Sequence, residues 1–331
     1  MSNLAGGRWL NGLTLAASLL FFWFFARQIN WAKALPLLAG LGPAPFLLYI
    51  GVNAGIAIFF ANRWWLLLRG LGVHLPFGRV AVYRLIGATV SLLTPGPQFG
   101  GETVQVWLLI RRSAVPAAPA LASVALDRML ELTLNLGFLV AGLLYTLGSG
   151  LLKVSLTAQS LALVLLPLGL PVIFFVSFWW RGGSLARHLF MLAHRLPTGW
   201  QSAALQRMLA GLAEGEAHIY RTLRGKPRLI GLGALLSALN WVVLLADFWL
   251  ATRLVGMQLS GLHFVSFVVA ARLAILLPIP AGLGALEASQ ILAAQSAGVN
   301  PALGLALVIL FRVRDLVLAL AGLGLVWQAK Q

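Results

Sequence analysis

The sequence predicts an all-α integral membrane protein built as an inverted repeat of two halves, with about six transmembrane helices plus two re-entrant helical hairpins. Three observations predict this fold class. The 331 residues are 60% hydrophobic and 10% charged, with a mean hydropathy of +0.92, which water-soluble domains of this size do not tolerate. Apolar stretches of membrane-spanning length recur along the chain. One motif of proline, glycine, glutamate and arginine occurs twice, as expected for a transporter made of two repeats.

Six stretches are apolar and about 20 residues long, which is the length an α-helix needs to cross the hydrocarbon core of a bilayer. They lie near residues 9–27, 43–63, 118–147, 158–180, 229–252 and 301–327. The first stretch ends in bulky aromatic residues rather than in a small-residue cleavage site. We therefore expect it to be a retained helix and not a cleaved signal peptide.

Two further apolar regions, 80–112 and 262–298, are interrupted midway by proline and glycine. Each half has only about 15 residues, which would barely cross a bilayer. Such broken segments are tolerated at membrane depth when they are buried in protein or line a wet cavity. We therefore expect a single transmembrane domain with one re-entrant hairpin in repeat 1 (about 9–147) and one in repeat 2 (about 158–327).

Lysine and arginine residues predict the orientation. Segment 181–228 is the longest polar segment and carries eight of them, so the positive-inside bias makes it cytoplasmic. Successive spans cross the membrane in alternating directions, so this connector also places both termini in the cytoplasm and gives the two halves opposite topology. The same alternation counts Arg63 among the cytoplasmic cations. Part of the connector has helical spacing of apolar residues, and lies either along the membrane interface or packed on the protein. We expect a multi-pass protein of the cell membrane, namely a bacterial inner membrane.

The repeated motif keeps its spacing in both copies. The first copy reads Pro95-Gly-Pro-Gln-Phe-Gly-Gly-Glu102 and continues with Arg128-Met-Leu-Glu131, and the second reads Pro280-Ala-Gly-Leu-Gly-Ala-Leu-Glu287 and continues with Arg312-Val-Arg-Asp315. Each copy predicts a break in the backbone, an acid beside the break and an ion-pairing face on the next span. The expected hairpin-turn residues are Pro95, Gly96, Gly100, Gly101, Pro280, Gly282 and Gly284.

Charged side chains in these apolar stretches must find partners, because an isolated charge at the bilayer centre costs roughly 2.5–3.5 kcal/mol on insertion scales. Two interpretations stay open. In one, the charges form salt bridges that lock the half-bundles together. In the other, arginines in a midplane polar cavity bind a lipid phosphate, and Glu102 and Glu287 act as gates or proton-linked partners. The candidate binding and translocation residues are Arg84, Glu102, Arg112, Asp127, Arg128, Glu131, Arg272, Glu287, Arg312 and Asp315.

Signatures of enzymes and metal sites are missing from the sequence. It contains no HExxH, Walker or GxSxG motif, and its five histidines have no metal-ligand spacing. There is no cysteine, so disulfides and thiolate metal sites are excluded. We expect no catalytic activity, no metal and no cofactor. The net charge of +16 indicates contact with anionic lipid rather than with nucleic acid.

The second copy of the motif resembles the membrane region of lysylphosphatidylglycerol synthases, in residues 277–287, 297–303 and Arg312. The first copy resembles the first signature of the same family, in residues 94–102, 109–112 and 127–131. The resemblance covers nearly the whole chain. It implies the flippase-like half of the multiple peptide resistance factor, in a standalone form without the aminoacyl-transferase domain.

The expected function is therefore a lipid flippase or transporter that moves an amphipathic lipid between the two leaflets. An anionic phospholipid, a hopanoid and a polyprenyl-linked lipid are the candidates that the resemblance implies. The alternatives are an intramembrane lipid-modifying enzyme, with Asp127, Glu131 or Asp315 as base, and a lipid-binding scaffold that does not transport. Membrane lipids with anionic headgroups are the expected partners, and the sequence leaves homo-oligomer formation open.

Overall fold

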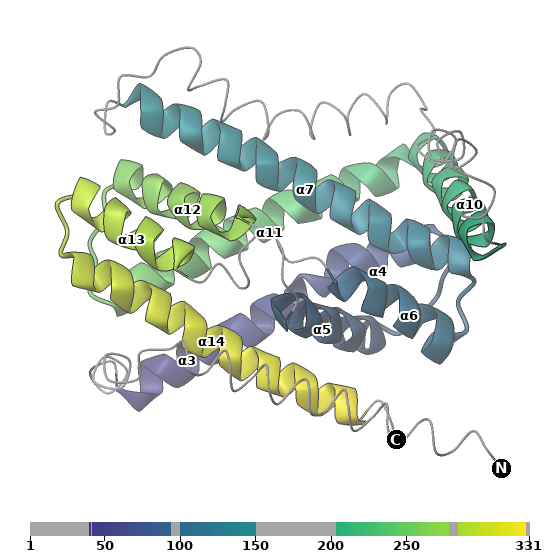
Figure 1. The fold of residues 1–331 in the computed structure, drawn as a ribbon, viewed down its shortest axis with the longest axis horizontal. Coiled ribbons are helices and arrows are strands. Elements are labelled where there is room, and N and C mark those ends of the chain that lie inside the picture. The colour runs from purple at the N-terminus through teal and green to yellow at the C-terminus, as the bar shows by residue number, and fades with distance from the viewer. Residues whose placement is uncertain (1–39, 41, 94–99, 150–202, 278–283, 329–331) are drawn as a thin grey trace. The chain divides into compact units, whose positions relative to one another are not determined.

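The computed structural model describes residues 40, 42–93, 100–149, 203–277 and 284–328. Every regular element in this part of the chain is an α-helix, which confirms the predicted all-α class (Figure 1). The helices are α3 (Pro43–Phe59), α4 (Ala61–Gly70), α5 (Phe77–Leu93), α6 (Gly101–Ser113), α7 (Ala117–Gly148), α10 (Ala203–Gly225), α11 (Pro227–Leu254), α12 (Gly261–Leu276), α13 (Ala285–Ser296) and α14 (Pro301–Gln328).

Three helical segments of the described chain are long and apolar enough to cross a membrane, namely Pro43–Gly70, Ala117–Gly148 and Pro227–Leu254. They cover the second, third and fifth predicted spans, and α14 covers the sixth. The predicted spans at 9–27 and 158–180 lie outside the described residues. The protein is thus an all-α membrane protein.

The second span is longer than the sequence analysis expected. Helix α3 ends at Phe59, but the Phe60 N–H still donates to the Ile56 carbonyl at 2.9 Å, and α4 follows at once. The helical segment therefore continues past residue 63, where the predicted span ended, as far as Gly70. This extension matters because it places Arg63 inside the helical segment rather than at its end.

Short paired helices occupy both predicted hairpin regions. Helices α5 and α6 have 17 and 13 residues, and α12 and α13 have 16 and 12. At about 1.5 Å per residue none of them reaches the roughly 30 Å thickness of a bilayer core. The connecting turns lie outside the described residues, together with four of the predicted turn residues: Pro95, Gly96, Pro280 and Gly282. The re-entrant placement of the hairpins stays a prediction.

The chain divides into two compact units. The central unit comprises Gly55–Gly87 and Gly101–Asp247, and the terminal unit comprises Met1–Ala54, Ala88–Gly100 and Phe248–Gln331. Each unit thus takes segments from both halves of the sequence.

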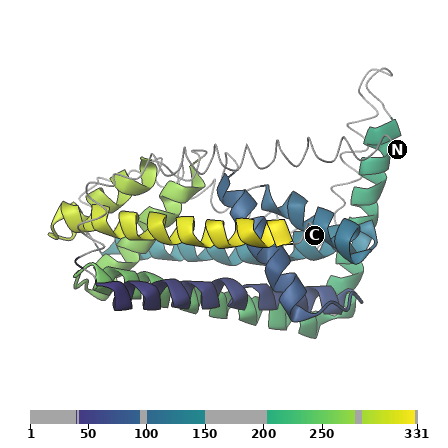
Figure 2. The same ribbon diagram turned by 90° about the horizontal axis from the view of Figure 1, so that it is seen from below.

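The core of the central unit is built where α4, α7, α10 and α11 meet. Leu67, Leu126, Leu130 and Ile219 are buried there against one another. Helix α10 crosses α7 near the N-terminal end of α7, as both views show (Figures 1 and 2). A Cβ atom on Gly215 would lie 3.7 Å from the Leu121 side chain. The described part of the connector therefore packs on the protein, which is one of the two arrangements expected for it.

The terminal unit contains α12, α13 and α14, packed in sequence order (Figure 1). Phe248, in the last part of α11, contacts the rings of Phe264 on α12 and Phe311 on α14, with centroid distances of 5.8 and 5.2 Å. These aromatic contacts fix the helices whose charged residues form the second copy of the motif.

Candidate functional site

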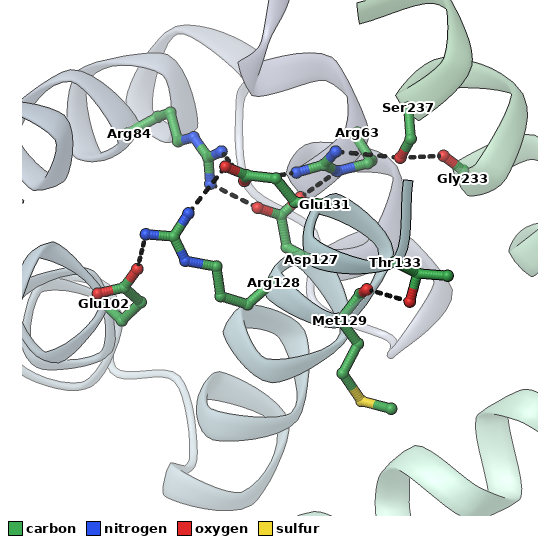
Figure 3. Close-up of polar contacts among 10 residues, drawn as sticks. All are labelled: Arg63, Arg84, Glu102, Asp127, Arg128, Met129, Glu131, Thr133, Gly233 and Ser237. Atoms are coloured by element: carbon green, nitrogen blue, oxygen red, sulfur yellow. Dashed lines mark hydrogen bonds and ion pairs between the residues drawn. The ribbon is translucent and has the colours of Figure 1, made fainter. Parts of the chain in front are cut away.

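Four charged side chains on three helices form one ion cluster in the central unit (Figure 3). Asp127 on α7 accepts from Arg63 Nε on α4 at 2.6 Å and from Arg84 Nη1 on α5 at 2.5 Å, using a different oxygen for each. One oxygen of Glu131, a turn further along α7, accepts from Nη2 of both arginines at 3.0 Å. Residues four apart share a helix face, so α7 presents both acids to both arginines. We call these four residues the inner cluster.

The inner cluster is most deeply buried at Asp127 and Arg63, whose side chains are 2% and 3% exposed. Arg63 also donates from Nη1 to Ser237 Oγ on α11 at 3.0 Å, and that hydroxyl donates to the Gly233 carbonyl at 2.8 Å. One guanidinium thus connects α4, α7 and α11. Each buried cation is matched by carboxylate oxygens, as burial in a medium of low dielectric constant requires.

Arg63 was counted among the cytoplasmic cations that set the predicted orientation, but the structure buries it in an ion cluster inside the protein. A signal was available in the sequence, because Arg63 is followed at once by the apolar run Trp64-Trp-Leu-Leu-Leu68. The helix can continue through such a run, with the arginine facing inward. Trp64 is fully buried beside it, and donates from its indole N–H to Ser123 Oγ at 3.2 Å.

Arg128 extends the cluster toward its more exposed edge (Figure 3). Its Nη1 donates to Glu131 at 2.8 Å on the same helix, and its Nη2 pairs with Glu102 on α6. The side chains of Arg128 and Glu102 are 20% and 23% exposed, about ten times more than that of Asp127. With this pair the network holds three arginines and three carboxylates, so its formal charge is zero.

The second copy of the motif forms the corresponding pair in the terminal unit. Glu287 Oε1 on α13 accepts from Arg312 on α14, at 3.1 Å from Nη2 and 3.3 Å from Nε. Glu287 Oε2 accepts the backbone N–H of Gly284 at 2.8 Å and so caps the start of α13. In both copies the glutamate beside the hairpin turn is paired with the arginine 25 or 26 residues later.

Both arginines lie at the same depth in their helices. Arg128 follows the start of α7 at Ala117 by the same number of residues as Arg312 follows the start of α14 at Pro301. At 1.5 Å per residue this is about 16 Å, close to half the thickness of a bilayer core. The equal depth agrees with the equal spacing of the sequence motif.

The last acid of the second copy departs from the first copy. Asp315 pairs with its neighbour Arg314 at 2.8 Å, whereas the corresponding Glu131 belongs to the inner cluster. Arg314 also lies 3.4 Å from the hydroxyl of Tyr49, a buried residue of α3. The equal Arg-to-acid spacing therefore does not produce equal pairing.

A glutamine that the sequence analysis did not connect with the motif follows the glutamate by three residues in both copies. Gln105 is buried and lies against Gly87 on α5, where a Cβ atom would find no room. Gln290 is fully buried and donates from Nε2 to the Phe267 carbonyl on α12 at 3.2 Å. The signal was the shared Glu-x-x-Gln pattern, and each glutamine ties the second hairpin helix to the first.

The structure brings five of the ten predicted site residues together in the central unit: Arg84, Glu102, Asp127, Arg128 and Glu131. It joins Glu287 to Arg312 in the terminal unit. Arg112 is exposed in the last turn of α6, about 15 Å along the helix axis from Glu102. Arg272 lies on α12 with a partly buried side chain.

Of the predicted turn residues, three glycines lie in the described chain. Gly100 and Gly284 have positive φ angles of 127° and 79°, which glycine adopts without a steric penalty, and each immediately precedes the helix that carries the paired glutamate. Gly101 is the first residue of α6. The glycines thus permit the break that the sequence predicted and set the start of each second hairpin helix.

Comparison with known proteins agrees with this architecture. A UPF0104 membrane protein of Methanothermobacter thermautotrophicus is 23% identical over 278 residues, which cover 82% of this chain and 81% of the relative. UPF0104 membrane proteins of Methanocaldococcus jannaschii and Pyrococcus horikoshii match over shorter parts, at 23% and 31% identity, and cover 38% and 27% of each chain. The model of the lysylphosphatidylglycerol synthase TM region matches residues 10–322, and the chain belongs to that family.

Proposed function

We propose that the protein moves an amphipathic lipid with an anionic headgroup between the leaflets of a membrane. The observation that carries this proposal is the pairing of a hairpin glutamate with a mid-helix arginine in both copies of the motif. Charges at this depth are costly in a membrane, and they mark substrate pathways in transport proteins. The family is described by the synthesis of a phospholipid, lysylphosphatidylglycerol, which agrees with a lipid ligand.

The inner cluster and the Glu–Arg pairs have different roles in this proposal. Both oxygens of Asp127 are taken by arginines in a nearly inaccessible position, so the inner cluster holds helices together. Arg128 and Arg312 each lie beside a carboxylate that is more than 20% exposed. These two arginines bind the lipid phosphate. The protein is multi-pass, its termini are cytoplasmic, and its two hairpins enter the membrane from opposite sides.

The test is leaflet exchange in reconstituted vesicles, with a fluorescent lipid and a quencher that reaches only the outer leaflet. The variants Arg128→Ala and Arg312→Ala are expected to lower the exchange rate at least about tenfold, because each loses its phosphate-binding cation. Arg253→Ala is the matched control, since Arg253 is exposed at the end of α11 and lies over the ring of Trp249.

Folding and activity are separated by the double variants Arg128→Gln/Glu102→Gln and Arg312→Gln/Glu287→Gln. Each removes one cation and one anion together, so the net charge does not change, and the protein is expected to stay folded in size-exclusion chromatography and still lose exchange. Wild-type rates in these variants would overturn the assignment. A lipid product of altered mass would favour an enzyme instead, and bound lipid without exchange would favour a scaffold.

A further inference from the structure

We infer that Glu102 and Glu287 each occupy a phosphate-binding position, so that the headgroup phosphate must displace a carboxylate of the protein to reach the arginine. The inference rests on the proposed function, because it names how the same two arginines take their ligand. Each glutamate is thus an internal competitor of the lipid.

The geometry of the Glu287–Arg312 pair in the terminal unit favours its displacement by a phosphate. Arg312 meets a single oxygen of Glu287, at 3.1 and 3.3 Å, whereas charge-assisted bonds are typically about 2.7–2.9 Å. The second oxygen of Glu287 is used by the Gly284 backbone. Arg312 therefore lacks the two-oxygen fork with Glu287 that a guanidinium binds best. A phosphate offers two oxygens to the same guanidinium and can replace the pair with a stronger one.

The two carboxylates that bind Arg128 are attached to different helices. Arg128 binds Glu131 on its own helix and Glu102 on the hairpin helix α6, so of these two carboxylates it is Glu102 that can leave with a movement of the hairpin. Glu102 and Glu287 both lie in the first turn of their helices, next to the hairpin turn. Gln105 and Gln290 hold the same helices one turn further on. In both copies the glutamate therefore lies between the hairpin turn and the glutamine that holds the helix in place.

Charge balance permits the exchange. An arginine at membrane depth cannot be left without an anion, because an uncompensated buried charge is strongly destabilising. Exchange of a carboxylate for a phosphodiester replaces one negative charge by another, so the number of negative charges beside the arginine does not change. The displaced glutamate lies at the more accessible edge, where its side chain is 23% or 28% exposed. The exchange is therefore possible without a large electrostatic barrier.

The experiment measures binding in an uncharged detergent by titration calorimetry, with a detergent blank. Three probes are used: dihexanoyl phosphatidylglycerol, glycerol 3-phosphate as the phosphate without tails, and dihexanoylglycerol as the tails without phosphate. If each arginine is released from its glutamate about a tenth of the time, competition raises the apparent dissociation constant about tenfold. Glu102→Gln and Glu287→Gln are each expected to bind phosphatidylglycerol about tenfold more tightly than the wild type, and to exchange it between leaflets more slowly.

Two controls keep the result specific. Glu214→Gln removes the same charge from an exposed position on α10 and is expected to change the affinity less than about twofold. Glu102→Asp keeps the competing charge on a shorter side chain, and is expected to tighten binding less than Glu102→Gln. It also reports on the site if the glutamine variant fails to fold.

The outcomes separate this inference from the proposed function. Tighter binding of phosphatidylglycerol alone identifies a lipid source for the phosphate, and equal tightening with glycerol 3-phosphate identifies recognition of the phosphate itself. Unchanged or weaker binding in both glutamine variants overturns the inference, as does equal tightening with dihexanoylglycerol. If the glutamine variants bind phosphatidylglycerol more tightly but the wild type shows no leaflet exchange, the phosphate positions are supported and the transport function is overturned. If the wild type exchanges lipid but the glutamine variants do not bind it more tightly, the transport function is supported and the phosphate positions are overturned.

Discussion

Asp127→Asn is expected to destabilise the protein by about 3–5 kcal/mol, because it leaves a buried and a partly buried guanidinium group without their shared carboxylate. Asp127 binds Arg63 at 2.6 Å and Arg84 at 2.5 Å, and its side chain is almost inaccessible. Glu131 alone cannot neutralise both cations. The measurement is the apparent melting temperature in detergent, followed by circular dichroism, and a fall of several degrees or more is expected.

Glu214→Gln is the matched control for this prediction. Glu214 is also an acid on a helix of the central unit, but its side chain is exposed on α10. Exposed charges of this kind contribute about 0–1 kcal/mol, so the melting temperature of this variant is expected to stay close to that of the wild type. Equal losses in the two variants would mean that the inner cluster contributes nothing beyond an exposed charge.

The sequence predicted the all-α membrane class and the helices of four spans, because the bilayer restricts the alternatives. Apolar length alone indicated the span in α7, and the described helix ends within a residue of the expected limits at 118 and 147. The glycine breaks predicted both hairpin regions, and the repeated spacing singled out Glu102, Arg128, Glu287 and Arg312 as corresponding residues of the two copies. The sequence required these charges to find partners, because a charge in an apolar stretch is costly, but the pairing of each glutamate with the arginine of its own copy came from the structure.

What the sequence could not predict depends on helix rotation and on tertiary contacts. Arg63 was expected among the cytoplasmic cations because it stands near the end of an apolar stretch, and its contact with Asp127 depends on the continuation of the helical segment through α4. Asp315 was expected to act with Arg312, but in the structure it pairs with Arg314. Long side chains of adjacent residues on a helix can bring their charged groups into contact. The burial of Gln105 and Gln290 and their contacts with the first hairpin helix could not be predicted, because they arise only from the packing of the helices.

Gly304→Ala is expected to destabilise the terminal unit by about 1–3 kcal/mol, the usual effect of overpacking. A Cβ atom at this position of α14 would lie 2.5 Å from the carbonyl oxygen of Gln290 and 2.9 Å from its carbonyl carbon. These are backbone atoms of α13, so no side-chain rotation relieves the clash and the helices must separate. The measurement is again the melting temperature. Gly137→Ala is the control, because the same substitution on α7 meets nothing within 4 Å and replaces glycine by a better helix former.

The separation would also act on the second Glu–Arg pair, because Glu287 and Arg312 lie on the two helices that Gly304 holds together. Their contact is already long, at 3.1 Å for the shorter of its two bonds, so a shift of a few tenths of an ångström weakens it further. Gly304→Ala is therefore expected to bind phosphatidylglycerol more tightly than the wild type, in the same direction as Glu287→Gln, although no charge has been removed. If Gly304→Ala instead lowers both the stability and the affinity for phosphatidylglycerol, close packing of α13 on α14 is needed to form the binding position. Glu287 would then belong to that binding position and would not compete with the lipid for Arg312.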